Sequence, residues 1–440
     1  MSIDTASAAD RQSAALAELA QFPLLDALYG RRARRISMGS TIPDGPLAYE
    51  SQHEPVPLSE LERLVVLTSM AGTTGWHYSI TRNAHYAGHM ANYAAGAAGR
   101  TFPSAAGFQT SELFFTDDSG TYMFPTRDAG ALVDPAEEEI TPELMLERHA
   151  QRIVKLSDDR IEFPREEPYY EGHNTWCVNV PGSLLAFPVG DLAQHALAGI
   201  MFLTQNGYCL TDDVNGRAIP GIERFRGLVD VDDGFPLTFF DQYMLAEITA
   251  ELATSCYAGM LVLQGMGLGG WMFDGIDRFS MLGASGDPDI PGLGFRYDED
   301  ERWSVPNPTG REGVFEAFCP PHHPDMRAAV EALSERKFGA GGPHNADTPG
   351  AWSESALVRS SAQVHDERFR ECVALQAQYL YDTFGKFPAT VPSLMILNYL
   401  QAHHLDLDFY DQKLRPGSYL PTHARHMETW HGGYVRRREP

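Results

Sequence analysis

Residues 264 to 271 read QGMGLGGW, and three of these glycines have the spacing G-x-G-x-x-G. Gly265, Gly267 and Gly270 could form a dinucleotide-binding turn, which requires a strand before the glycines and a helix after them. Here the order is reversed, because the apolar periodicity predicts a long helix over 242–266 and glycine is the usual residue after a helix end. The run therefore indicates a helix terminus, and a dinucleotide turn is disfavoured.

A second candidate for chemistry is the basic run Arg31-Arg32-Ala33-Arg34-Arg35, which follows a predicted helix over 8–29. Clustered guanidinium groups suit a phosphate dianion, because each can bind two oxygens at once. A solvated surface turn is the alternative for such a run taken alone.

Metal binding is the other chemistry considered. His85 and His89 stand four residues apart, a spacing that can bind a metal, but no H-E-x-x-H pattern contains them. We expect no metal site. The remaining paired or clustered histidines are interpreted as loop residues: His322, His323, His423, His426 and His431.

Composition excludes several classes of function. The formal net charge of −25 disfavours phosphate backbones and anionic membranes, so we expect no nucleic-acid or membrane partner. Five cysteines without a CxxC pair suggest reduced thiols. No signal peptide is evident, and no stretch of 18 apolar residues occurs. A cytoplasmic protein is expected.

Helices and strands are both predicted, which indicates an α+β chain. The clearest helix is 242–266, where Ile248, Leu252, Cys256 and Met260 recur every four residues in a segment apolar nearly all round. A helix over 59–70 begins with a capping box formed by Ser59 and Glu62. Further helices are predicted over 141–155, 190–206 and 362–383, a hairpin over 111–116 and 121–124, and loops over 283–312 and 338–352.

The stretch AELATSCYAGMLVLQGMGLGGWMFDGID resembles the central helix and following strand of the nitroreductase family of flavin enzymes. The resemblance implies a three-layer sandwich, with a central mixed or antiparallel sheet flanked by helices. It also implies bound FMN and a homodimer with the long helix in the interface. Because it covers about 30–300, we expect an FMN-binding domain over 1–300 and a C-terminal extension of unknown role over 301–440.

A more specific likeness lies in RTFPSAAGFQTSELFFTDDSGTYMF, which resembles the SagB/McbC-like branch that oxidises azolines to azoles in modified peptides. The arginine run resembles the R-x-S-x-R element of the nitroreductase family, which implies that Arg31 and Arg35 hold the FMN phosphate, with Arg296 completing the site. The residues expected beside the flavin ring are Pro103, Ser104, Ala105, Gly107, Gly267, Gly269 and Gly270. The sequence departs from the expected patterns in three ways: Ala33 replaces a serine, the run Ala71-Gly72-Thr73-Thr74-Gly75 lacks the usual proline, and Asp241-Gln242-Tyr243 stands where the branch carries a Lys-Tyr pair. Tyr243 could act there as a proton donor and Asp241 as an acceptor.

The resulting expectation is an FMN-dependent oxidoreductase that transfers hydride to or from a small molecule or a peptide in natural-product tailoring. Trp76, Phe108 and Trp271 are candidates to gate the open face of the ring. The alternative is a non-catalytic protein of the same fold whose flavin site has decayed and which binds a ligand or partner. A metal-dependent hydrolase using the histidine-rich C-terminal part is a third class.

Overall fold

The computed structural model describes residues 8–78, 94–433 and 437, and these form a mixed α+β structure. The described helices are α1 (Ala8–Ala20), α2 (Leu24–Gly30), α3 (Glu60–Ala71), α4 (Pro142–Ala150), α5 (Leu192–Gln205), α6 (Leu237–Met266), α7 (Arg278–Leu282), α8 (Met326–Phe338), α9 (Ser355–Ser360), α10 (Glu367–Phe384), α11 (Leu407–Lys413) and α12 (Pro421–His431). Two short 3-10 turns accompany them, η1 (Ala105–Gly107) and η2 (Ile222–Phe225).

The strands form one large sheet and four small ones. Those of the large sheet are β5 (Ser111–Asp117), β6 (Gly120–Phe124), β7 (Val154–Ser157), β8 (Leu184–Asp191), β12 (Gly269–Phe273), β16 (Leu394–Ile396) and β17 (Tyr399–His403). The small sheets contain β1 (Thr41–Ile42), β2 (Tyr49–Glu50), β3 (Thr73–Trp76), β4 (Ala98–Arg100), β9 (Tyr208–Asp212), β10 (Arg217–Ala218), β11 (Asp230–Pro236), β13 (Arg296–Asp298), β14 (Asn307–Arg311) and β15 (Phe315–Glu316).

The large sheet has the order β12-β17-β8-β5-β6-β7, with β16 also paired to β8, and every pairing is antiparallel. Strand β17 lies between β12 and β8, although it comes from residues expected to form a C-terminal extension. The boundary predicted at residue 300 therefore does not coincide with a break in the sheet. Residues 394–403 belong to the same sheet as the hairpin near residue 115.

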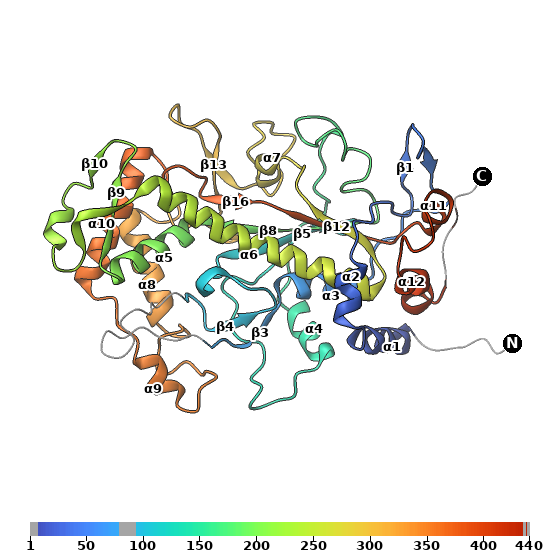
Figure 1. The fold of residues 1–440 in the computed structure, drawn as a ribbon, viewed down its shortest axis with the longest axis horizontal. Coiled ribbons are helices and arrows are strands. Elements are labelled where there is room, and N and C mark those ends of the chain that lie inside the picture. The colour runs from blue at the N-terminus through green and yellow to red at the C-terminus, as the bar shows by residue number, and fades with distance from the viewer. Residues whose placement is uncertain (1–7, 79–93, 434–436, 438–440) are drawn as a thin grey trace.

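The two faces of the sheet have different covers (Figure 1). Phe115 on β5 lies under the guanidinium of Arg63 from α3, 5.7 Å from the ring centre. The next residue back, Phe114, points to the opposite face and packs edge-on against Phe295 and Phe315. This alternation is the two-residue period of a strand. Helices α3 and α6 thus cover one face of the sheet, whereas β13–β15 and adjoining loops cover the other. The predicted sandwich had helices on both faces.

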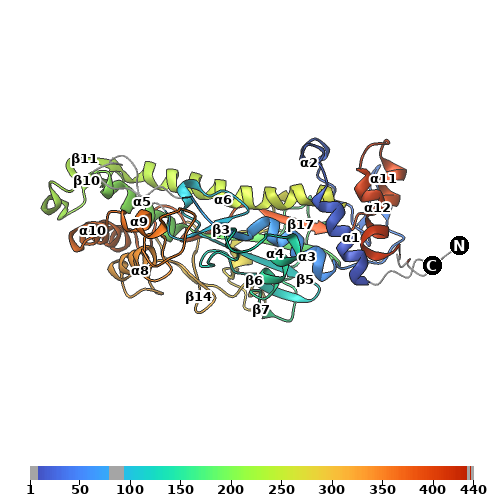
Figure 2. The same ribbon diagram turned by 90° about the horizontal axis from the view of Figure 1, so that it is seen from below.

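Helix α6 runs along one long side of the molecule, with its outer side uncovered over most of its length (Figure 2). Ile248, Leu252 and Leu263 on its inner side are fully buried. The helix ends at Gly267, whose φ of +81° is the left-handed conformation that glycine adopts most readily. The predicted helix end at the glycine run is therefore confirmed.

Several other predicted elements are confirmed with changed limits. Ser59 accepts from the backbone of Glu62 and the Glu62 carboxylate accepts from Ser59, so the capping box is present. The helix predicted over 8–29 is interrupted before Pro23, because proline lacks an N–H and its ring clashes with the preceding turn. The interpretation of the C-terminal histidines as loop residues is wrong, since 421–431 is helix α12. His85 and His89 lie outside the described residues.

Helices α1 and α12 lie side by side at one end of the molecule (Figures 1 and 2). Arg425 of α12 forms an ion pair with Glu18 of α1 at 2.5 Å. Of the helices in the described part of the chain, none combines the length and apolar character that crossing a bilayer requires.

Candidate functional site

The predicted site residues are spread along α6. Asp241 and Tyr243 lie in its first two turns, the loop containing Ser104 packs against its middle, and the glycine run follows its last turn. Asp241 and Gly267 are 26 residues apart on the helix, and at a rise of about 1.5 Å per residue this separates them by about 39 Å. Within one chain these residues do not form one cavity.

The loop that contains Ser104, which packs against the middle of α6, is held by the fully buried carboxylate of Glu251. Its Oε2 accepts from the hydroxyl of Ser104 at 2.5 Å. Its Oε1 accepts from the backbone of Thr110 and from both the backbone and the hydroxyl of Ser111, at 2.6–3.0 Å. A side chain at Gly107 would meet nothing within 4 Å. The segment 103–111 is thus fixed at Ser104 and at Thr110–Ser111 and is open at Gly107.

Asp241 and Tyr243 point to opposite sides of α6. Asp241 is buried and accepts from the backbone and hydroxyl of Thr390, both at 2.8 Å. Burial raises the pKa of Asp241 to about 6. Tyr243 is 49% exposed and stacks on Phe239. The structure therefore does not join them as an acid–base pair.

The basic run and the glycine run lie together, although more than 230 residues separate them in the chain. The backbone of Arg34 pairs with that of Gly270 through two hydrogen bonds of 3.3 and 2.9 Å. The Arg34 side chain is buried and donates only to neutral oxygens, including Oε1 of Gln264 at 2.7 Å. Arg35 lies over the ring of Trp271, 5.3 Å from its centre. The two sequence elements predicted to hold one cofactor are therefore neighbours.

Among the residues that the structure describes, none of Arg31, Arg32, Arg34 and Arg35 forms an ion pair with a carboxylate. Arg31 approaches only the sulfur of Met260, at 3.9 Å. Arg32 donates to the carbonyls of Tyr29 and Arg31. The arginine cluster, as we call 31–35, is thus an uncompensated positive charge on a chain of net charge −25.

The glycine run itself is covered by the chain. A Cβ atom at Gly267 would overlap the carbonyl of Thr422, and one at Gly270 would overlap the carbonyl of Gln401. The amides of Gly267 and Leu268 donate to the carbonyl of Leu263, and that of Gly270 donates to Arg34. Close packing of the protein's own backbone accounts for these glycines, and the three amides are not free to donate to a flavin.

Three further predicted residues lie elsewhere. Arg296 is exposed on β13, away from the arginine cluster (Figure 1), and pairs with Asp298 at 3.2 Å. Phe108 is buried edge-on against His195. Trp271 is buried as well. Trp76, the third aromatic residue considered as a gate, lines a pocket.

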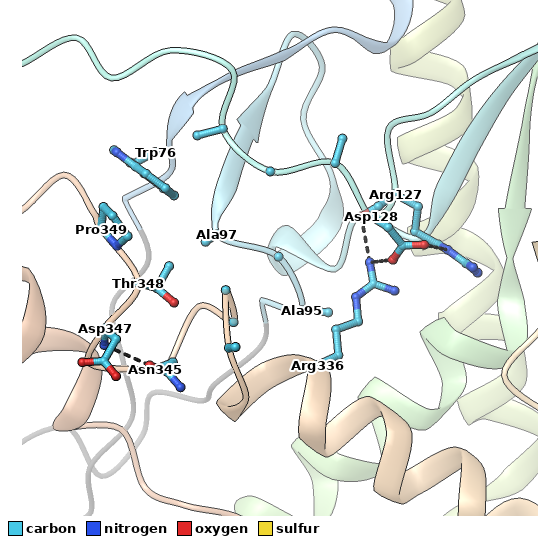
Figure 3. A pocket seen from close by; sticks show the side chains of 17 residues that line it. Trp76, Ala95, Ala97, Arg127, Asp128, Arg336, Asn345, Asp347, Thr348 and Pro349 are labelled. Atoms are coloured by element: carbon cyan, nitrogen blue, oxygen red, sulfur yellow. Dashed lines mark hydrogen bonds and ion pairs between the residues drawn. The ribbon is translucent and has the colours of Figure 1, made fainter. Parts of the chain in front are cut away.

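That pocket has a volume of about 610 Å³, within the usual range for small-molecule sites. Figure 3 shows Trp76 on one side of it and Arg336 with Asp128 on the other. Backbone of Gly341 and Gly342 and small side chains over 95–97 form its walls. The mixture of an indole face, small walls and a few polar groups suits a planar ligand with a polar edge.

A charged network forms one side of this pocket. Arg336 pairs with Asp128 at 2.6 Å and donates to the carbonyl of Arg127 at 2.7 Å. Arg127 in turn pairs with fully buried Asp191 at 2.9 Å. Burial lowers the pKa of Arg336, while Arg127 and Arg336 together outweigh burial and lower that of Asp128. The network fixes the pocket wall at 127–131 against α8.

Sequence reasoning did not find this pocket. Its walls come from four separate segments, Trp76, 95–97, 127–131 and 336–349. In the last of these, 340–349 was predicted only as a connecting loop. A usable signal existed in that loop, since FGAGGPHNADTPGAW combines glycines with hydrogen-bonding side chains in a long segment between two helices.

No protein-family model matches the chain, and a search of curated proteins finds no match. Among solved structures, the chain is similar to a candidate nitroreductase from Ralstonia eutropha JMP134. The two are 12% identical and superpose with a TM-score of 0.26, over 58% of this chain and 72% of that one. None of these comparisons supports the SagB/McbC-like branch predicted from the sequence motifs.

Proposed function

We propose that the chain is an FMN-dependent oxidoreductase that acts as a two-fold homodimer. The observation that carries this proposal is the arginine cluster, which has no carboxylate partner among the described residues and lies against the glycine run. Unpaired guanidinium groups on a strongly acidic chain favour a bound anion, and the phosphate of FMN meets that requirement.

In this proposal Arg31 and Arg35 bind the phosphate, since both side chains are partly exposed. Arg34 holds the segment in place through its buried hydrogen bonds to Gln264 and to the carbonyl of Ser418. Bound FMN would supply hydride transfer to or from a small molecule or peptide. The likeness of 100–124 to azoline oxidases supports a peptide-tailoring reaction, whereas the missing Lys-Tyr pair argues against azole formation itself.

The proposed dimer is supported by an apolar surface on the outer side of α6. Tyr257 is 37% exposed there, and Leu24 and Tyr29 of neighbouring α2 are 65% and 76% exposed. Large apolar side chains exposed together usually mark an interface, and the self-complementary shape of a long helix suits a second copy of this chain.

Two-fold packing would also complete the site. Thr254, which donates to the carbonyl of Pro103, is 13 residues from Gly267, or about 20 Å along α6. An antiparallel α6 pair crossing near Met260 would set Thr254 opposite Gly267 of the partner subunit. The segment 103–107 would then lie near the partner's arginine cluster, so both predicted parts of the flavin site would meet across the interface.

The test is the flavin content of the purified full-length protein. We expect a yellow dimer that retains FMN through gel filtration. The double variant R31A/R35A should bind FMN on the order of a hundredfold more weakly, because two charge-assisted contacts are lost. R32A is the matched control, since Arg32 donates only to neighbouring carbonyls. Tyr257→Arg should give a monomer by sedimentation and lose FMN with it.

A second candidate is supported by the cover over the glycine run. Because Thr422 and Gln401 already occupy the space beside Gly267 and Gly270, the chain would be a non-catalytic binding protein whose ligand enters the pocket beside Trp76 (Figure 3). A colourless protein that FMN cannot reconstitute would support this candidate and overturn the first.

A further inference from the structure

Four side chains that could bind a metal ion meet where α12 packs onto the body of the protein. They are Glu62 from the first turn of α3, His404 just after β17, and His426 and His431 from α12. One potential ligand atom of each lies within 4.8 Å of those of the other three. We call this group the Glu62–His431 cluster. No part of the proposed flavin site uses it.

The contacts inside the cluster are short. Oε1 of Glu62 lies 2.9 Å from Nε2 of His426 and 3.0 Å from Nε2 of His431. Nδ1 of His404 lies 3.0 Å from the same Nε2 of His426. Tetrahedral zinc with bonds of about 2.0–2.1 Å places neighbouring ligand atoms about 3.4 Å apart. These three pairs would need to open by only a few tenths of an ångström to accept such an ion, and the remaining pairs of ligand atoms lie within 4.8 Å.

The outer nitrogen atoms of two rings already have partners. Nε2 of His404 lies 3.3 Å from the carbonyl of Pro57, and Nδ1 of His426 lies 2.8 Å from the carbonyl of Met266. A carbonyl can only accept, so each of these nitrogens carries a hydrogen. In neutral rings the other nitrogens, Nδ1 of His404 and Nε2 of His426, then carry lone pairs that face into the cluster. Outer hydrogen bonds to backbone carbonyls are the usual way in which proteins orient histidine ligands of metals.

Hydrogen bonds among these side chains do not satisfy all of the acceptors in the cluster. The inner lone pairs of His404 and His426 face each other at 3.0 Å, and the second also faces the Glu62 carboxylate. One added proton on His426 can serve either Glu62 or His404, but not both fully. A divalent cation accepts lone pairs from all four groups together and offsets the buried negative charge.

We propose that the Glu62–His431 cluster is a structural zinc site that anchors α12 to α3 and to the end of β17. Three imidazoles and one carboxylate are ligands that zinc prefers, and four protein ligands close the tetrahedron. Glu62, His404 and His426 are buried, so the site has no open position for a substrate. His431, with a side chain 19% exposed, gives the ion a path of entry.

The ligand spacing explains why a motif search does not detect this site. The four residues come from three segments, with Glu62 and His431 separated by 369 positions, and the two on α12 are five residues apart. Only the density of histidines after residue 403 gives a signal. Glu62 has a second task, because its other oxygen accepts from the backbone of Ser59 in the capping box at 2.7 Å.

The experiment measures metal in the full-length protein, purified without a histidine tag, incubated with zinc chloride and passed through gel filtration. We expect one zinc per chain by mass spectrometry and a lower Tm after chelation. Replacing zinc by cobalt should give the intense visible bands of tetrahedral Co²⁺. H426A and H431A should each bind zinc more than about a hundredfold more weakly, since even loss of an outer hydrogen bond costs 10–100-fold.

His423 provides the matched control, because it is a buried histidine on the same helix outside the cluster. H423A should retain zinc. If H426A does not fold, H431A decides the question, since its side chain is partly exposed. Absence of zinc after this treatment, or equal zinc in H431A and the unaltered protein, would overturn the proposal. Neither result bears on FMN content, so the two proposals are tested separately.

Discussion

Asp241 offers the sharpest test of the energetics, through the variant D241N. Its carboxyl is buried at the start of α6, next to Thr390 and near Lys386. Burial raises the pKa of Asp241 from 3.8 to about 6 in the folded protein. The folded state thus holds the proton more tightly than the unfolded state. Ionisation of this group therefore opposes folding.

The sign and size follow from linkage. A shift of about 2 units corresponds to about 3 kcal/mol of unfolding free energy. The stability that the protonated group contributes is fully present below pH 3.8 and is lost as the pH rises to about 6. Asparagine has nearly the same shape and no charge to bury. D241N should therefore match the unaltered protein near pH 4 and exceed it by about 3 kcal/mol above pH 6.

The assay is urea unfolding of both proteins at intervals from pH 4 to pH 8. Replacing Asp289, an exposed loop carboxylate, with asparagine controls for the change in net charge. A difference between D241N and the unaltered protein that stays constant over this range would refute the reasoning. So would a D241N protein that is less stable at pH 8, because Thr390 would then be bonding to a charge that the fold requires.

Two further substitutions test buried contacts. E251A removes the acceptor of four hydrogen bonds and should lower the unfolding free energy by about 3–5 kcal/mol. S104A removes only one of the donors and should lower the unfolding free energy by about 1 kcal/mol. Equal losses in the two variants would contradict the role of Glu251. R127M leaves the buried carboxylate of Asp191 without its ion-pair partner and should lower the unfolding free energy by about 3–5 kcal/mol. A loss below about 1 kcal/mol in calorimetry would mean that this ion pair is not needed for stability.

Local patterns predicted the elements that short-range physics determines. The capping box of α3, the hairpin β5–β6 and the end of α6 at Gly267 each depend on residues within one or two turns. Such features are visible in sequence because their hydrogen bonds and backbone conformations are local.

The features that sequence reasoning missed depend on contacts between distant segments. No pattern in residues 399–403 indicates pairing with both β12 and β8, because an antiparallel strand can join any edge with a suitable register. The pocket beside Trp76 and the contact between Glu62 and His426 likewise join segments that are far apart in the chain, so no local pattern predicts them. The glycines at 267–270 were visible, but they indicated only that something approaches closely, and in this structure it is the protein's own backbone.

The position of β17 affects how the polypeptide can be made. Until residue 403 has left the ribosome, β8 has an unpaired edge towards β12, and β12 has no strand beside it. Two open edges invite pairing with other chains, and long-range closure of a sheet is slow. Growing chains therefore expose two open sheet edges until residues 399–403 can fold between them. A fragment ending near residue 300 would keep both edges open, and we expect it to aggregate more readily than a chain that contains β17.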